Sequence, residues 1–152
     1  MDAHKKMNEK DYIEQRVEDQ LAWFEKKSGL NQVRYKRLRL VAIVLSALIP
    51  LLVGFISDDL DWLKIATGAA GVLIAIVEGL LSLYKYQENW IQYRSTAEAL
   101  KRESFFYKTS SGEYRKAKDP FPLFVERIEA IIEGDTRNWQ QYISKDDSSS
   151  VV

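Results

Sequence analysis

The chain has 152 residues, with 22 Lys and Arg against 22 Asp and Glu, one His and no Cys. This length suits a single domain. The lack of Cys excludes disulfides, Cys zinc sites and a thiol nucleophile, and the lone His4 excludes a histidine cluster for a metal. A net charge of zero argues against a nucleic-acid partner. No nucleotide, phosphate or metal motif is present, so we expect neither a cofactor nor an enzyme.

Residues 1–37 are expected to form a cytoplasmic helical segment. Apolar residues recur at helical spacing between Tyr12 and Lys27, which predicts an amphipathic helix; they are Ile13, Val17, Leu21 and Phe24. Ser28 and Gly29 should end this helix, and Asn31 can cap the start of the next one.

Two long apolar runs follow. Residues 40–57 contain no charge, and residues 65–84 contain only Glu78, so both reach the length of a transmembrane helix. We expect spans at 38–57 and 65–84, joined by an acidic loop at 58–64. The alternative is a pair of buried core helices in a soluble protein, although a chain of this length seldom buries two such helices on all sides. The first run starts too far along the chain for a signal peptide.

Charges beside the spans predict their orientation. Basic residues precede the first span, Lys85 follows the second, and the loop carries three Asp. The positive-inside rule then places both termini in the cytoplasm and the acidic loop outside. The basic residues are also expected to contact lipid headgroups; they are Arg34, Lys36, Arg37 and Arg39.

Small residues recur at every fourth position in both spans. The rows are Thr67, Gly71, Ala75 and Gly79 in the second span, and Ala42, Ser46, Pro50 and Gly54 in the first. Such rows let helices approach closely in lipid, either within the hairpin or between protomers. Pro50 is a candidate hinge, because proline frees a carbonyl in the preceding turn.

Glu78 is the main candidate for a pore or gating residue. It shares a helical face with four small or polar residues: Gly71, Ala75, Ser82 and Lys85. Three interpretations stay open, because intramembrane carboxylates are costly and face protein or water. Glu78 is a structural group, protonated or paired with Lys85 or a first-span arginine, or it serves permeation or gating, or it relays protons.

The acidic loop also has two interpretations. Asp58, Asp59 and Asp61 form either a solvated turn or, in a symmetric oligomer, acidic rings at the outer mouth. Such rings would concentrate monovalent cations.

Residues 85–143 are expected to form cytoplasmic helices. No Gly or Pro occurs between Gly79 and Gly112, so the second-span helix should continue unbroken past the membrane. Its predicted heptad seam is Leu83, Tyr86, Trp90, Tyr93, Ala97, Leu100, Ser104 and Tyr107. A break is predicted over 109–112.

A last helix should begin at Asp119 and Pro120. Its apolar stripe is Phe121, Phe124, Val125, Ile128, Ile131 and Ile132, with Trp139 and Tyr142 completing its packing. Residues 144–152 should be disordered. The expected fold is an all-α membrane protein, in which a two-span hairpin carries a cytoplasmic bundle of the N-terminal helix, the extended second-span helix and the C-terminal helix.

Several segments resemble the SLATT superfamily of bacterial two-transmembrane domains. They are residues 78–90 (EGLLSLYKYQENW), Tyr93 and Arg94, 96–103 (TAEALKRE), 35–39 (YKRLR) and 124–128 (FVERI). The similarity spans about residues 11–142. It implies an oligomeric, pore-forming effector proposed for nucleotide-signalled bacterial conflict systems, which would permeabilise the inner membrane.

Two functions are compatible with the sequence. The first is a homo-oligomeric ion channel or pore, a tetramer or pentamer that favours cations through Glu78 and the acidic loop. The second is a non-conducting scaffold in the lipid bilayer, which recruits cytoplasmic partners through its helices. The trigger, whether a cytoplasmic regulator or a nucleotide ligand, stays open.

Overall fold

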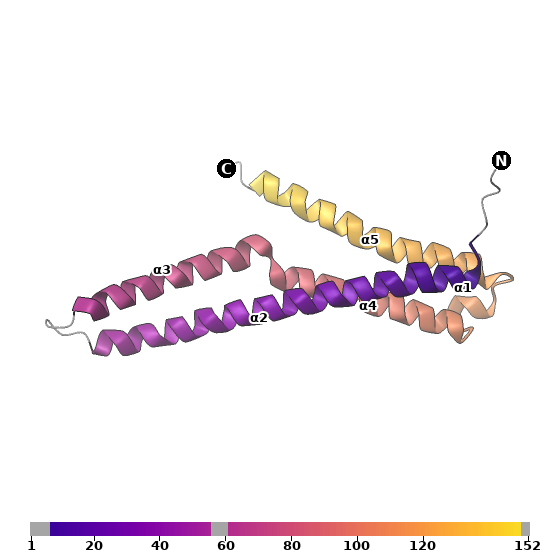
Figure 1. Ribbon diagram of the computed structural model, residues 1–152. Coiled ribbons are helices and arrows are strands. Elements are labelled where there is room, and N and C mark those ends of the chain that lie inside the picture. Colours follow the sequence, from indigo (N-terminus) through magenta and orange to yellow (C-terminus); the bar gives the residue numbers. More distant parts are fainter. Residues whose placement is uncertain (1–6, 56–60, 150–152) are drawn as a thin grey trace, which may run out of the picture. The chain divides into compact units, whose positions relative to one another are not determined.

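The computed structural model describes the backbone of residues 7–55 and 61–149, and the side chains of residues 7–55 and 61–134. In these residues the regular structure is entirely helical (Figure 1). The elements are α1 (Glu9–Tyr12), η1 (Ile13–Glu18), α2 (Asp19–Gly54), α3 (Asp61–Tyr84), α4 (Tyr86–Lys108), η2 (Gly112–Arg115) and α5 (Pro120–Ser149). The chain divides into two compact units, which are described separately.

The first helical stretch begins with a capped turn. The Asn8 side chain accepts a hydrogen bond from the Asp11 backbone N–H at 2.8 Å, and the acidic Glu9 and Asp11 lie in the first turn, where the helix dipole favours them. The wider π-helical turn η1 follows directly and passes into α2.

The predicted end of the N-terminal helix at Ser28 and Gly29 is wrong. Both residues lie inside α2, which runs from Asp19 to Gly54. One glycine inside a helix costs only about 1 kcal/mol, and here it lies within a helix of 36 residues. Ser28 is also buried, at 6% exposure, so its position is held by packing.

The second-span helix is broken where the sequence predicts continuity. α3 ends at Tyr84, and Lys85 adopts a left-handed backbone conformation with φ of 46° before α4 begins at Tyr86. The Asn89 side chain donates to the Tyr84 carbonyl at 3.0 Å, which satisfies one of the acceptors exposed by the break. The rings of Tyr84 and Tyr86 stack across it with centroids 5.4 Å apart.

The break after α4 and the start of α5 are confirmed. Ser110 and Gly112 have positive φ angles of 49° and 59°, and η2 follows as a single 3₁₀ turn. α5 begins at Pro120, the position at which proline suits a first helical turn. The helix extends to Ser149, and this differs from the disordered tail predicted from residue 144. The expected packing of Trp139 and Tyr142 lies outside the described side chains.

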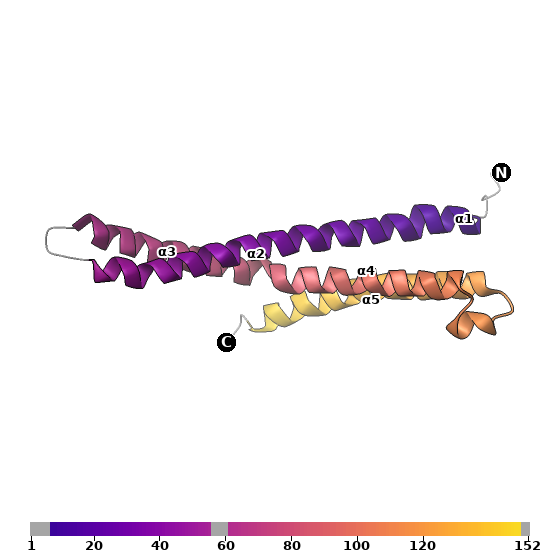
Figure 2. The same ribbon diagram turned by 90° about the horizontal axis from the view of Figure 1, so that it is seen from below.

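The first unit, residues 1–28 and 91–152, is called the bundle unit. α1 with η1 and the start of α2, most of α4, and α5 lie lengthwise beside one another in it (Figure 2). Its core is made of buried residues from all of these segments and η2: Tyr12, Val17, Phe24, Ala97, Leu100, Tyr114, Phe124 and Ile128. Tyr107 stacks on Phe124 at 4.3 Å between ring centroids. The predicted stripes of the N-terminal and C-terminal helices supply much of this core.

The second unit, residues 29–90, is called the hairpin unit. It contains the later part of α2 and all of α3, which run in opposite directions (Figure 1). Its buried hydrophobic residues are Ala42, Leu63, Ala70 and Val77. Two helices of the chain are long and apolar enough to cross a membrane, and only 6% and 11% of their most apolar windows are buried. A core helix of a soluble protein is mostly buried, and these two windows are not.

Candidate functional site

An ion pair joins the two helices of the hairpin unit. Arg39 Nη1 on α2 lies 2.7 Å from Glu78 Oε1 on α3. This arrangement matches one alternative considered for Glu78, a partner arginine at the start of the first span. The side chains are 50% and 47% exposed, so the pair lies on the surface of the hairpin.

The predicted face around Glu78 forms one flank of α3. Ala75 and Ser82 are exposed beside Glu78, whereas Gly71 and Lys85 are half-buried. Val77, the residue before Glu78, is buried. The candidate pore or gating residues therefore lie at the edge of the contact between the two helices. Three of them, Ala75, Glu78 and Ser82, are accessible from outside the hairpin unit.

The rows of small residues are only partly used inside the hairpin. Thr67 and Gly71 are half-buried, but Ala75 and Gly79 are exposed. A Cβ atom added at Gly71 or Gly79 would meet no atom within 4 Å. The close backbone approach that such rows permit is therefore not made at these glycines within one chain. In the first-span row, Ala42 is buried while Pro50 and Gly54 are exposed.

The loop residues fall largely outside the described part of the chain. Asp58 and Asp59 lie in the range 56–60, so their place in an acidic ring is not described. Asp61 begins α3, and its carboxylate accepts a hydrogen bond from Lys64 Nζ at 2.8 Å. Pro50 lies inside α2, which continues to Gly54, and its role as a hinge stays a prediction.

The basic cluster before the first span is divided by the ion pair. Arg34, Lys36 and Arg37 are exposed, as headgroup contacts would require. Arg39, by contrast, is directed to Glu78. Sequence spacing places all four cations together, but only the structure distinguishes the one that contacts the second helix.

A second polar cluster, in the bundle unit, was not predicted. Arg16 donates from Nε and Nη2 to the two carboxylate oxygens of Glu129 at 2.9 and 2.7 Å, and the Tyr12 hydroxyl donates to the same carboxylate at 2.9 Å. The hydrogen bonds from Arg16 hold the pKa of Glu129 below its usual value. Burial, reinforced by Glu129, raises the pKa of Tyr12. This cluster connects η1 to α5.

A third cluster surrounds a buried carboxylate. Glu103 on α4 is 5% exposed; it accepts a hydrogen bond from the Tyr114 hydroxyl and pairs with Arg127 Nε at 2.5 Å. Arg127 also contacts Glu113 at 2.6 Å. Burial and the bond to Glu103 raise the pKa of Tyr114. Donors from η2 and α5 satisfy the Glu103 carboxylate. This arrangement is typical of a structural carboxylate and not of a reactive acid.

Comparison with known protein families gives a match that covers most of the helices. The model of a family described as "Protein of unknown function (DUF4231)" matches residues 19–121, more than half of the chain. The chain belongs to the DUF4231 family. No curated protein and no solved structure matches it. The DUF4231 match includes Arg39 and Glu78, both helices of the hairpin unit, and α4.

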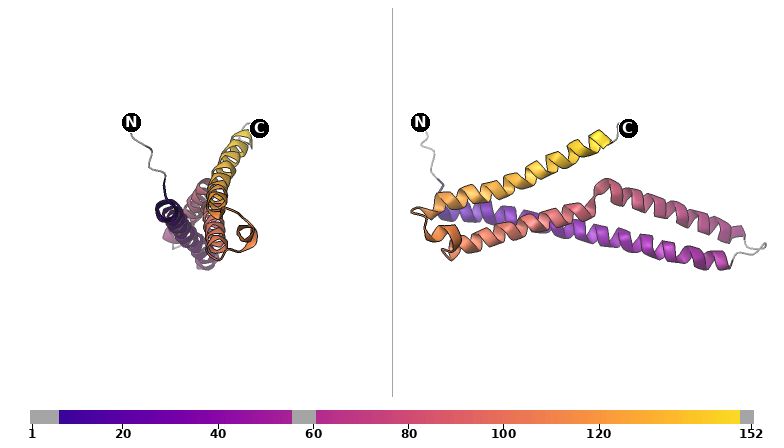
Figure 3. Two further views of the ribbon diagram at one scale, coloured as in Figure 1. Left: turned by 90° about the vertical axis from the view of Figure 1, so that its right-hand side faces the viewer. Right: turned by 180° about the vertical axis from the view of Figure 1, so that it is seen from behind.

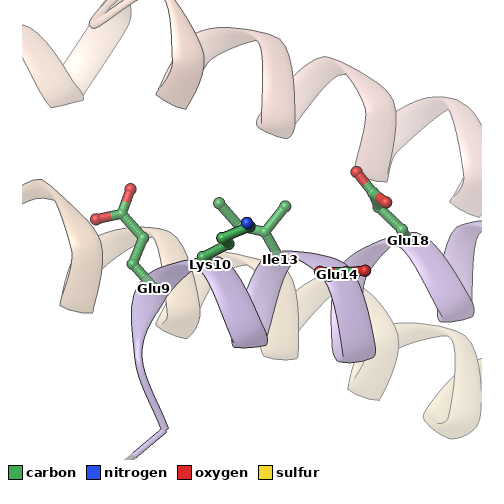
Figure 4. A pocket seen from close by; sticks show the side chains of 5 residues that line it. All are labelled: Glu9, Lys10, Ile13, Glu14 and Glu18. Carbon is green, nitrogen blue, oxygen red and sulfur yellow. The ribbon is translucent and has the colours of Figure 1, made fainter.

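The described part of the DUF4231 chain has an open groove but no cluster of metal-ligating side chains. No group of three or more His, Asp or Glu side chains in this part of the chain could hold a metal ion. An open groove of about 390 Å³ lies along α1 and η1, lined by Glu9, Lys10, Ile13, Glu14 and Glu18 (Figure 4). The groove was not predicted from the sequence, because the pattern of its charged residues is typical of the solvated face of an amphipathic helix.

Proposed function

We propose that the chain is inserted in the inner (plasma) membrane as a two-span hairpin with both termini in the cytoplasm. Large apolar side chains on α3 are widely exposed, including Ile65 at 74% and Val72 at 60%. Exposure of this extent is unfavourable in water and is accounted for by contact with lipid. The basic residues before the first span and the acidic loop support the orientation.

The ion pair between Arg39 and Glu78 carries the functional proposal. Both side chains are about half exposed on the hairpin surface. Ionised groups in a membrane span are costly unless they face protein or water. This side of the hairpin is therefore expected to face another subunit or an aqueous path. Since two helices cannot enclose a pore, we propose a homo-oligomeric ion channel or pore, either a tetramer or a pentamer.

Cation conduction is the preferred form of this proposal. Repeated around a symmetric axis, Glu78 would supply a ring of carboxylates within the second span, and Asp61 would supply another in the loop before it. Arg39 and Lys64 offset part of this charge, so we expect preference for monovalent cations rather than strict selectivity. The role is non-enzymatic in this proposal.

The DUF4231 match overlaps most of the segments that resemble the SLATT superfamily, and we propose that the chain belongs with it. On that basis the channel would be an effector in bacterial conflict or stress signalling. Its trigger would be a cytoplasmic regulator or a nucleotide ligand that acts on the bundle unit.

Ion flux through purified protein in liposomes tests the channel. Potassium and chloride gradients are measured separately for the wild type, for Glu78→Gln, and for Glu88→Gln as the control. Glu88 is an exposed carboxylate on α4, beyond the second apolar run. We expect potassium flux that changes at least about threefold with Glu78→Gln and is unchanged by Glu88→Gln, with the oligomer mass in detergent retained.

The outcomes separate the interpretations. Flux that is insensitive to Glu78→Gln would keep the pore and return Glu78 to a structural role beside Arg39. Chloride flux that exceeds potassium flux would refute the cation preference. No flux from a folded oligomer, with or without added cell-extract ligands, would refute the channel.

The scaffold is the alternative, and one observation favours it. The bundle unit exposes large aromatic side chains, with Phe105 at 68% and Trp23 at 45% exposure. A recruiting surface would have such residues. In that case Glu78→Gln would cause no loss beyond a change in stability.

A further inference from the structure

The end of α4 and the turn after it form an exposed aromatic and basic surface. Phe105 and Phe106 are 68% and 41% exposed, although they lie next to Tyr107, which packs into the core. Four exposed cations accompany them: Lys108, Arg115, Lys116 and Lys118. None of these cations has an ion pair among the described residues. We call Phe105, Phe106 and the four cations the basic tip.

The groove along α1 and η1 has the opposite charge. Glu14 and Glu18 are exposed along it and have no ion pair with any described residue. Ile13 is half-buried and supplies an apolar patch in the groove. In Figure 4 the side chains of Glu9 and Glu18 project on either side of Ile13. We call this feature, lined by Glu9, Lys10, Ile13, Glu14 and Glu18, the acidic groove.

The two surfaces lie at the same end of the bundle unit. The Tyr107 hydroxyl donates to Glu9 Oε1 at 2.6 Å, so the start of the acidic groove is level with the last turn of α4. Burial, together with this bond to Glu9, raises the pKa of Tyr107 to about 12. The basic tip begins at the residues on either side of Tyr107. In the end-on view of Figure 3, α1 and the turn that carries η2 lie on opposite sides of α4 and α5.

This placement suits a ring of identical subunits. In such a ring each copy contacts its two neighbours through two different patches. Patches on opposite sides of one bundle cannot meet within a chain, but they can meet between neighbours. Their charges are complementary, and the phenylalanines match the apolar patch at Ile13.

We propose that the basic tip of one chain docks in the acidic groove of a second copy. Lys116 and Lys118 would pair with Glu14 and Glu18, while Phe105 would cover Ile13. The proposal rests on the oligomer of the proposed function, and it names a cytoplasmic interface for that oligomer.

Charge reversal in the full-length protein tests this interface. One variant carries Lys116→Glu and Lys118→Glu, a second carries Glu14→Lys and Glu18→Lys, and a third combines all four changes. Lys26→Glu, at another exposed cation, is the control. The mass in mild detergent is measured across protein concentration. We expect each double variant to raise the concentration at half-dissociation at least about tenfold, and the combined variant to restore assembly.

A cross-link gives a second readout that does not depend on stability. The chain has no Cys, so Glu14→Cys and Lys116→Cys can be purified separately and mixed. A disulfide-linked dimer from the mixture, absent from either variant alone, supports the proposal. Failure to cross-link in an oligomer, or double variants with unchanged mass, would overturn it.

These experiments distinguish failure of the proposed interface from failure of the proposed channel. If the reversals change nothing while the wild type is oligomeric and conducts ions, only this interface is refuted. If the wild type is monomeric both in detergent and in liposomes, the oligomeric channel is refuted as well. Binding of an acidic partner that is lost when the tip is reversed, with the oligomer mass unchanged, would refute self-assembly here and assign the tip to that partner.

Discussion

The bundle unit and the hairpin unit are both helical, yet they differ in how many of their large apolar side chains they bury. The bundle unit places large residues in its core, among them Phe124 and Ile128 at 1% and 0% exposure. The hairpin unit buries Ala42, Ala70, Leu63 and Val77, and exposes many large side chains, such as Ile65 at 74%. Burial of large apolar groups stabilises a fold in water, whereas in lipid close packing of small groups has that role.

The polar contacts that join helices also differ between the two units. The bundle unit links its helices through carboxylates held by several donors, as Glu103 and Glu129 are. In the hairpin unit, an exposed ion pair between Arg39 and Glu78 joins the two helices. The comparison shows that the two sets of helices differ in how they bury apolar surface, and the membrane proposed for the hairpin unit would account for that difference.

The largest expected effect comes from the bundle core. Phe124→Ala should lower the free energy of unfolding of the bundle unit by about 3–5 kcal/mol, because it leaves a cavity among fully buried groups. Hydrogen exchange measured by segment in detergent would detect faster exchange in the bundle helices. Ile91→Ala, at a site 47% exposed, should change little. Equal loss of protection in α3 would contradict the separation of the two units.

The hairpin contact should respond to added volume instead. Ala70→Leu is expected to destabilise the hairpin by about 1–3 kcal/mol, because Ala70 is 8% exposed and a larger side chain overpacks the helix contact. Circular dichroism during titration with sodium dodecyl sulfate in mixed micelles measures this loss. Val72→Leu, at 60% exposure, is the matched control. A similar effect of both variants would show that α2 and α3 do not pack through this face.

The smallest expected effect is a dependence on pH in the bundle unit. The pKa of Glu129 is lowered by its hydrogen bonds from Arg16, so its contribution to stability is complete above the unfolded carboxyl pKa of about 4.3. That contribution is lost as the pH falls through the lower folded pKa. Unfolding midpoints between pH 7 and pH 3 should therefore decline less steeply in Glu129→Gln than in the wild type. Glu126→Gln, at an exposed carboxylate, should keep the wild-type slope; identical slopes in all three proteins would contradict the assignment.

Much of the fold follows from local patterns. The uncharged runs predict the two apolar helices, and the break before Gly112 and the start at Pro120 lie where the sequence places them. These features depend on composition and backbone preferences within a few residues. The predicted seam holds at Ala97 and Leu100, which are fully buried, but not at Leu83, which is 75% exposed.

The features that could not be predicted depend on contacts between distant residues. Glu78 has Lys85 and several arginines within plausible reach, and only the packing of α2 on α3 selects Arg39. Glu103 resembles any other exposed carboxylate in a helical pattern until Tyr114 and Arg127 enclose it. Gly29 has the residue type of a helix end, but it lies in a long helix where its propensity is outweighed.

The left-handed conformation of Lys85 has a consequence for sequence variation. A residue with a Cβ atom costs about 1 kcal/mol or more at positive φ, glycine has no such cost, and asparagine tolerates the conformation well. Relatives that keep the break should therefore carry Gly, Asn or an unbranched residue at this position, and should avoid Val, Ile and Pro. A position after the apolar α3 helix that accepts glycine but excludes branched side chains would mark the break in relatives whose other residues have diverged.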